Sequence, residues 1–194
     1  MTAIPGALSA AVLASMVMTT MTTYAAGAPH KSADEMVALM AQAQKDGRLR
    51  TARKTKLVDA RPARAGEVIV TVIAGEGQET SSKPAAAGDQ VVRNRCPQTG
   101  NEQYLVAAAK FAGKYEATAK PADKDGWQEY RPVAGDMRVL LLDAGTPPFT
   151  FTAPWGEAMV ARGGDAILQD PKDARDVYRV ARASFDCTYE IREP

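Results

Sequence analysis

The chain has 194 residues, of which 45% are hydrophobic and 24% are charged, and its formal net charge at pH 7 is +1. This composition is typical of a folded protein with a hydrophobic core and argues against disorder over most of the length. So small a net charge excludes a whole-protein field that would steer the chain onto nucleic acid or an anionic membrane.

The first 28 residues carry no charged side chain and contain the small, apolar run GALSAAVLASMVM. Ala26-Gly27-Ala28 fits the cleavage pattern of a secretory signal peptide, although no Lys or Arg precedes the run. The run is shorter than the roughly 20 residues that span a bilayer. We predict a signal peptide over residues 1–28 and a periplasmic or secreted protein. An uncleaved membrane anchor and a cytoplasmic protein are the alternatives.

Residues 29–57 are expected to form one helix followed by a basic connector. Ser32 and Glu35 have the spacing of a capping box, and apolar residues then recur every three or four positions until Gly47, which predicts an amphipathic helix over 33–46. Between Arg48 and Arg64 seven basic residues face a single acid, Asp59. We interpret this run as a solvated connector. A docking segment for an anion, RNA or a lipid headgroup is the alternative, although no aromatic residue is present to stack on a base.

From residue 66 onward the pattern is extended, with the segments EVIVTVI, DQVVRN, MRVLLLD and FTFTAPW. These segments are rich in β-branched and aromatic residues and are separated by Gly, Pro and Asp, which favour turns. The sequence therefore predicts short strands and a mainly β (α+β) fold.

Two stretches of the chain are nearly the same. Residues 104–116 (YLVAAAKFAGKYE) and 178–190 (YRVARASFDCTYE) are identical at seven of thirteen positions, and the segments RPARAGEVIVTVI and AAGDQVVRN have counterparts upstream of the second copy. We interpret this as an internal repeat of two small β-rich units, 58–118 and 128–192, joined by a polar segment. In each unit a Phe and a Tyr four residues apart predict a short helical turn that packs its aromatics against a sheet.

Each unit also carries a Gly-Asp pair, Gly88-Asp89 and Gly164-Asp165, which suits a turn with a positive φ at Gly and an Asp side chain bonded to the backbone. Together with the short strand, the loop, the Phe and the final Tyr-Glu, this pair resembles the small PGDYG-type proteins. The Pro and Tyr of that motif are absent from both copies. The resemblance covers the two units but not the N-terminal helix, and it implies a fold rather than an activity.

Several kinds of chemistry are disfavoured by what the sequence lacks. The single histidine, His30, precedes both units, so Ser-His-Asp and Cys-His mechanisms, a structural zinc site and a histidine-based cupin metal site are not expected. No phosphate-binding or dinucleotide-binding glycine motif occurs. We therefore expect no metal and no cofactor. Cys96 and Cys187 can form a disulfide in an oxidising compartment or remain free thiols in a reducing one.

Two groups of residues are candidates for contact with a ligand. Trp155, Glu157, Arg162 and Asp165 offer an aromatic platform beside a carboxylate and a guanidinium, which together could hold a polar ligand. The alternative is a core Trp, a solvated Glu and a turn Asp. Arg93 and Arg95 lie in an expected hairpin arm and could contact a partner or serve solubility only.

The leading functional hypothesis is an exported, non-catalytic binding or interaction protein for an unknown small molecule or protein. The alternative is a hydrolase or lyase that uses carboxylates near Trp155 and Glu157. Binding of an anionic polymer through residues 48–64 is a third possibility.

Overall fold

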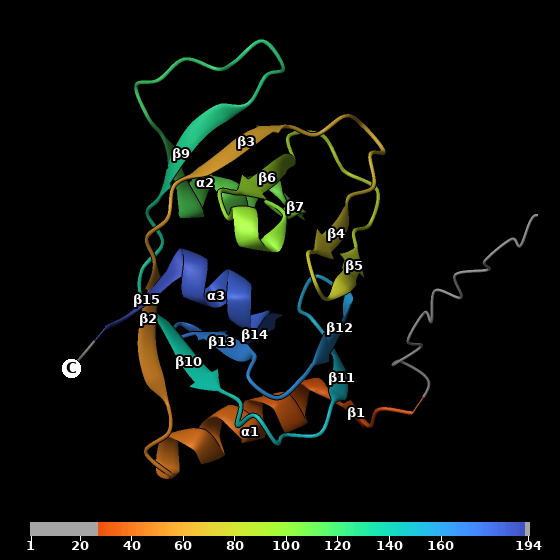
Figure 1. Cartoon of the computed structure of the whole chain (residues 1–194), viewed down its shortest axis with the longest axis vertical. Coiled ribbons are helices and arrows are strands. Elements are labelled where there is room, and N and C mark those ends of the chain that lie inside the picture. Colours follow the sequence, from red (N-terminus) through yellow and green to blue (C-terminus); the bar gives the residue numbers. More distant parts are fainter. Residues whose placement is uncertain (1–26, 193–194) are drawn as a thin grey trace, which may run out of the picture.

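The structure is a computed structural model that describes residues 27–192 (Figure 1). Residues 1–26, which hold most of the predicted signal peptide, lie outside the described residues. The described part is mainly β with a few short helices, so the predicted fold class is confirmed. No helix among residues 27–192 has the length and apolar character needed to cross a bilayer.

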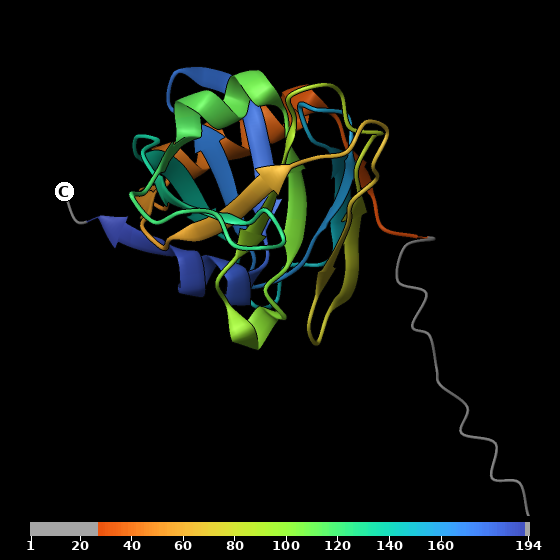
Figure 2. The ribbon, with the colours of Figure 1, turned by 90° about the horizontal axis from the view of Figure 1, so that it is seen from above.

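Two antiparallel five-stranded sheets form the body of the molecule, and we name each after its central strand. The β10 sheet has the order β14 (Asp173–Val180), β13 (Ala166–Asp170), β10 (Met137–Leu141), β2 (Arg50–Lys54) and β15 (Tyr189–Arg192). The β3 sheet has the order β7 (Gln103–Val106), β6 (Gln90–Asn94), β3 (Val58–Pro62), β9 (Gln128–Pro132) and β8 (Tyr115–Ala117). Figure 1 shows the β3 sheet above the β10 sheet along the long axis, and Figure 2 shows the same ribbon from above, down that axis.

The remaining elements flank these two sheets. The helices are α1 (Ala33–Lys45), α2 (Ala108–Lys114), α3 (Arg182–Thr188) and the 3-10 helix η1 (Pro97–Thr99). The smaller sheets are β1 (His30–Lys31) with β11 (Phe149–Thr152) and β12 (Ala158–Ala161), and the hairpin β4 (Val70–Ile73) with β5 (Gly77–Ser81).

The two large sheets have corresponding strand orders, but each takes one strand from the other half of the chain. Strands β3, β6, β7 and β8 occupy the places that β10, β13, β14 and β15 occupy in the other sheet. The remaining places go to β9, which directly precedes β10 in the chain, and to β2, which directly precedes β3. The first strand of each half is therefore exchanged into the opposite sheet.

The links that follow the exchanged strands are held in the same way. The Thr55 N–H donates to the carbonyl of Thr188 at the end of α3 (3.0 Å), and the Val133 N–H donates to the carbonyl of Lys114 at the end of α2 (2.9 Å). This correspondence is what an internal repeat leads us to expect, and the repeat itself stays a prediction.

The basic segment expected as a connector is in large part β structure. Strand β2 lies between β10 and β15, with Ala52 fully buried, and β3 is the centre of its sheet. The sequence does not predict these strands because most of their outward side chains are basic. A buried residue such as Ala52 then stands between charged neighbours. Of the seven basic residues of the run, Arg50, Arg53 and Lys54 lie in β2 and Arg61 lies in β3, while the other three lie outside these strands.

Helices cover the sheets with the aromatic and apolar faces that the sequence predicts. The capping box at α1 is present, with the Glu35 N–H donating to Ser32 Oγ (3.2 Å) and the Ser32 N–H donating to Glu35 Oε2 (2.7 Å). The apolar stripe of α1 packs on one face of the β10 sheet, and Phe185 of α3 packs on the other. Phe111 of α2 packs on the β3 sheet.

Two features tie the chain together over long distances. A disulfide joins Cys96, after β6, to Cys187 in α3, and so connects the loop of one half to the helix of the other. His30, expected to lie outside the folded units, is instead part of β1, which pairs with β11 in parallel, and its Nδ1 lies 3.3 Å from Thr150 Oγ1. The expectation for His30 was wrong because two residues are too short a strand to leave a sequence pattern.

Candidate binding groove

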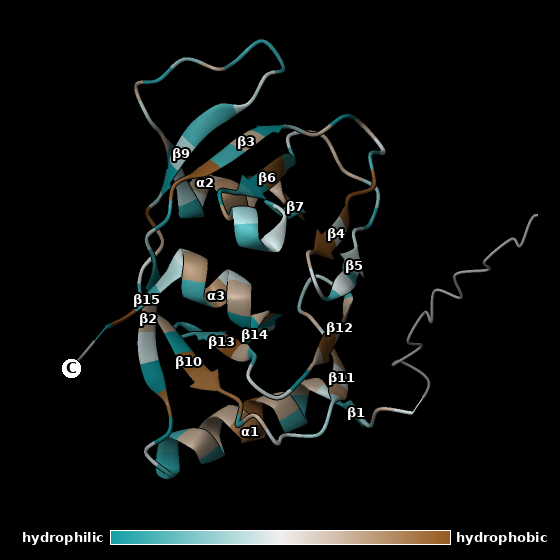
Figure 3. Ribbon diagram, in the orientation of Figure 1, coloured by the Kyte–Doolittle hydropathy of each residue, from teal (hydrophilic) through white to brown (hydrophobic). Residues whose placement is uncertain are grey.

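An apolar stripe lies at the surface of the β4–β5 hairpin. Val70 and Val72 of β4 and Val68 just before it are 46%, 51% and 46% exposed, while Ile69 and Ile73 between and beyond them are buried. Successive side chains of a strand point to opposite sides, so the three valines share one face. Figure 3 shows β4 in brown at the edge of the molecule. Exposed apolar side chains gathered in this way mark candidate contact surfaces.

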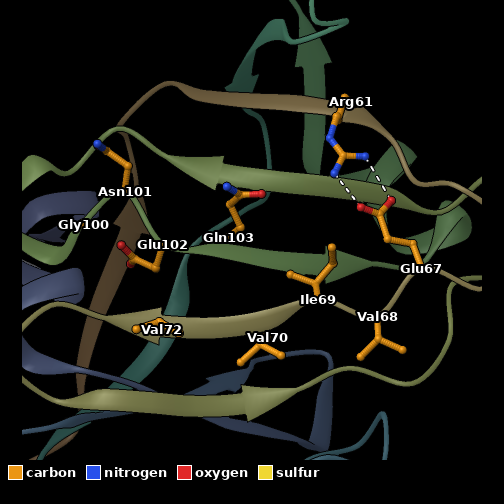
Figure 4. Close-up of a pocket in the computed structure, with 10 residues that line it drawn as sticks. All are labelled: Arg61, Glu67, Val68, Ile69, Val70, Val72, Gly100, Asn101, Glu102 and Gln103. Carbon is orange, nitrogen blue, oxygen red and sulfur yellow. Dashed lines mark hydrogen bonds and ion pairs between the residues drawn. The ribbon is translucent and has the colours of Figure 1, made fainter.

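A cavity of about 330 Å³ that is largely open to solvent lies beside these valines (Figure 4). Its lining combines the valine stripe with β7 and the turn before it, where Gly100, Asn101, Glu102 and Gln103 lie. At one end the Arg61 guanidinium makes a two-pronged ion pair with Glu67, with contacts of 2.6 and 3.0 Å. This pairing lowers the pKa of Glu67 to about 2, so the ion pair persists through the neutral range.

A second cavity, of about 470 Å³, shares Arg61 and Gln103 with the first. Trp127 lies in its wall, and the guanidinium carbons of Arg93 and Arg61 lie 4.2 and 5.2 Å from the centre of the indole. The loop before β9 fixes this Trp, because Asp123 Oδ1 accepts the Trp127 N–H (2.9 Å). We call the two adjoining cavities the groove. It runs from the valine stripe past Arg61 to Trp127.

Arg93 and Arg95, predicted as partner contacts, lie on the outer face of the β3 sheet but are engaged within it. Both pair with Asp59, at 2.9 and 2.5 Å, and Arg95 also pairs with Glu129 at 2.5 Å. Arg93 does not line either cavity, but it contacts Trp127, which does. Arg95 lines neither cavity.

The four residues predicted as a ligand cleft are only partly brought together. Asp165 and Arg162 join a cluster around Arg179, whose side chain is 1% exposed. Asp165 receives the Arg179 Nε at 2.8 Å, and Glu76 receives both Arg179 (2.6 Å) and Arg162 (3.4 Å). Glu79 completes the cluster at 2.5 Å from Arg179 Nη1. Burial raises the pKa of Glu79, and the Arg179 charge opposes that rise.

Trp155 and Glu157 stand apart from the Arg179 cluster. Trp155 is 40% exposed and its ring lies 5.7 Å from that of Tyr178, so it is not a core residue. Glu157 is half-buried, and its backbone carbonyl accepts the Ala153 N–H (2.8 Å). Neither residue lines the groove. Within the cluster both carboxylate oxygens of Asp165 are bonded, to Arg179 and to the backbone N–H groups of Arg162 and Arg182.

No protein-family model, curated protein or solved structure matches the chain. Within residues 27–192 no group of three or more His, Cys, Asp or Glu side chains is arranged to hold a metal ion.

Sequence reasoning missed the residues that form the groove. Val68, Val70 and Val72 were included in an expected strand, but the pattern EVIVTVI is apolar at nearly every position and does not show which side faces solvent. Trp127 directly follows the polar joint and precedes the second expected unit, so the sequence assigns it to neither. Its proximity to Arg61 and Arg93 depends on β9 pairing with β3, which no local pattern indicates.

Proposed function

We propose that this protein is an exported, non-catalytic binding protein that holds an extended polypeptide segment in the groove. The observation that carries the proposal is the exposed valine stripe, which opens onto a cavity ending at Arg61 and Trp127. Valines at alternate positions of a strand repeat every 6 to 7 Å or so, which is also the repeat of same-side residues in an extended peptide.

The composition of the groove narrows the class of peptide. The valines suit apolar side chains at alternate positions, and the indole suits an aromatic or apolar residue beyond them. Arg64 lines the Trp127 end, is exposed, and makes no ion pair within the described part of the chain, whereas Arg61 is neutralised by Glu67. A peptide with alternating apolar residues and an acidic residue at one end matches this arrangement.

The alternative of a carboxylate-dependent hydrolase or lyase near Trp155 and Glu157 has less support. The carboxylate oxygens of Asp165 are bonded to Arg179 and to the backbone N–H groups of Arg162 and Arg182. A general acid or base needs a free oxygen facing a substrate. The resemblance to PGDYG-type proteins stays a prediction and assigns no ligand.

The test is a selection of random peptides displayed on phage against the intact protein, followed by measurement of binding by calorimetry. We expect enriched peptides to alternate apolar residues and to carry an acidic residue at one end. Val70→Asp should weaken their binding at least about tenfold, since it places a charge on an apolar contact.

Val133→Asp is the matched control, because Val133 is 47% exposed and lines neither cavity. Its binding should equal that of the unaltered protein. Failure to enrich any peptide, or equal weakening by both substitutions, would refute the groove as a peptide site.

A further inference from the structure

Four tyrosines gather where the two halves of the molecule meet. Tyr104 of β7 and Tyr115, at the start of β8, have their hydroxyls 3.1 Å apart, and Tyr178 of β14 and Tyr189, at the start of β15, have theirs 3.5 Å apart. The first pair packs against the core of the β3 sheet and the second against that of the β10 sheet. These are the residues that begin and nearly end the two matching sequence stretches.

Lys54, the last residue of the exchanged strand β2, extends into this cluster. Its Nζ donates to Tyr104 Oη (2.8 Å) and to Asn94 Oδ1 (2.9 Å), and lies 5.2 to 6.0 Å from the ring centres of Tyr104, Tyr115 and Tyr189. No carboxylate within residues 27–192 lies at ion-pair distance from it. The amine is therefore held by neutral partners alone.

The surroundings of Lys54 favour its neutral form. Burial lowers the pKa of Lys54 to about 7, the Glu102 charge opposes this, and the Lys114 charge adds to it. Lys114 lies over the ring of Tyr178 at 5.7 Å, and burial lowers the pKa of its amine too, with Asp176 and Lys110 as further influences. A desolvated lysine beside a second cationic group is a recognised way to obtain a nucleophilic amine near neutral pH.

The cluster is not sealed from solvent. Lys54, Lys114 and all four tyrosines are half-buried, whereas the aliphatic residues packed behind them are fully buried. Lys54 as a residue is thus partly exposed, while its amine is poorly solvated.

We propose that Lys54 is a nucleophile that binds small carbonyl compounds carrying a carboxylate, and that it holds them as an imine. The lone pair of Nζ attacks the carbonyl carbon, while the Tyr104 hydroxyl gives its proton to the carbonyl oxygen. One nitrogen proton returns to the tyrosine, which then donates it to the hydroxyl of the carbinolamine. Water leaves as the C=N bond forms, and the second nitrogen proton restores the tyrosine hydroxyl. Lys114 supplies the positive charge that pairs with the carboxylate. This site is separate from the groove.

The probe is glyoxylate with cyanoborohydride at about pH 7, followed by peptide mapping of the unaltered, full-length protein. Reduction fixes any imine as a stable secondary amine. Lys56 is the internal control because it is exposed and only two residues away. We expect Lys54 to be labelled at least about tenfold faster than Lys56, since far more of its amine is neutral at this pH.

Three further measurements test the parts of the proposal. Tyr104→Phe should slow labelling of Lys54 severalfold and leave Lys56 unchanged. Replacing glyoxylate by acetaldehyde should reduce the preference for Lys54, and so should Lys114→Met with glyoxylate. Equal labelling of Lys54 and Lys56, or a preference that survives in denaturant, would overturn the proposal.

Discussion

At the scale of single residues, the Asp of each Gly-Asp turn accepts hydrogen bonds both from its own turn and from the first residue of a helix. Gly88 and Gly164 have φ values of 87° and 92°, as the sequence predicts for these turns. Asp89 accepts the N–H of Ala86 within its turn (2.9 Å) and also the N–H of Ala108 at the start of α2 (3.1 Å). Since Ala107, the N-cap of α2, provides no side-chain cap, Asp89 caps that helix from a distance.

The second turn repeats this arrangement with an added charge. Asp165 accepts the N–H of Arg162 (2.8 Å) and of Arg182 at the start of α3 (3.3 Å), and it also pairs with the buried Arg179. The sequence predicts the turn but not the distant helix or the arginine. Those contacts depend on how β14 and α3 pack.

These two aspartates give a paired prediction for stability. Asp89→Ala should lower the free energy of unfolding by about 1 to 2 kcal/mol, because two backbone N–H groups lose their acceptor. Asp165→Ala should lower it by about 3 to 5 kcal/mol, because the Arg179 charge also loses a partner. Urea unfolding followed by circular dichroism measures both. Asp173→Ala, which removes an exposed turn contact to the Arg175 N–H, is the control, and equal losses at all three positions would contradict this account.

Lys54 gives a prediction for pH dependence. Its pKa in the folded state, about 7, lies below its unfolded value, so the folded protein binds fewer protons between about pH 7 and pH 10. The free energy of unfolding should therefore rise with pH across this window. It should fall again above about pH 10, since burial raises the pKa values of Tyr104 and Tyr178 and the unfolded chain loses those protons first.

Urea unfolding at several pH values measures this dependence. Lys54→Met should flatten the rise between about pH 7 and pH 10, and Lys56→Met should leave it intact. A rise of the same size in Lys54→Met would show that other groups cause it.

At the scale of elements, the strength of the local pattern decides what could be predicted. Helix α1 is predicted within one residue, over 33–46 against Ala33–Lys45, because its cap and its apolar spacing both lie within one short stretch. The short helices α2 and α3 follow from the Phe-to-Tyr spacing, and their aromatic pairs stack with ring centres 5.1 and 5.2 Å apart. Strand β2 could not be predicted, since a single buried alanine among basic residues carries no periodicity.

The turn before β13 gives a prediction at this scale. A Cβ on Gly163 would lie 2.2 Å from the carbonyl oxygen of Ala144, so Gly163→Ala must displace backbone and should lower the free energy of unfolding by about 2 kcal/mol. Gly135→Ala meets no atom within 4 Å and should be neutral or slightly stabilising. Thermal unfolding of the two variants measures the difference, and equal midpoints would show that the turn can relax.

At the scale of the whole molecule, the sequence predicts two related units but not how they combine. The resemblance between residues 104–116 and 178–190 indicates two similar pieces, and the two sheets do have corresponding strand orders. The exchange of β2 and β9 cannot be predicted from the residues of either strand. The sequence pattern of a strand does not show which sheet it joins. The groove and the tyrosine cluster both depend on this exchange, so neither could be predicted.

The disulfide gives a prediction for the whole molecule. The Cys96–Cys187 link closes a separation of 91 residues, and the chain-entropy model gives such a loop about 4.6 kcal/mol of stabilisation. Cys187→Ser should lower the free energy of unfolding by 2 to 5 kcal/mol or so, as should reduction of the unaltered protein. Treating the Cys187→Ser variant with reductant should not lower its free energy of unfolding any further. A further decrease would show that the reductant acts elsewhere.

The exchanged strands also set the order in which this chain can fold. Strand β2 is synthesised well before its two neighbours, β10 and β15, which follow β9 in the chain. The β3 sheet likewise waits for β9. Each sheet can complete its hydrogen bonding only after a strand from the other half is in place, so folding depends on long-range pairing, which slows it.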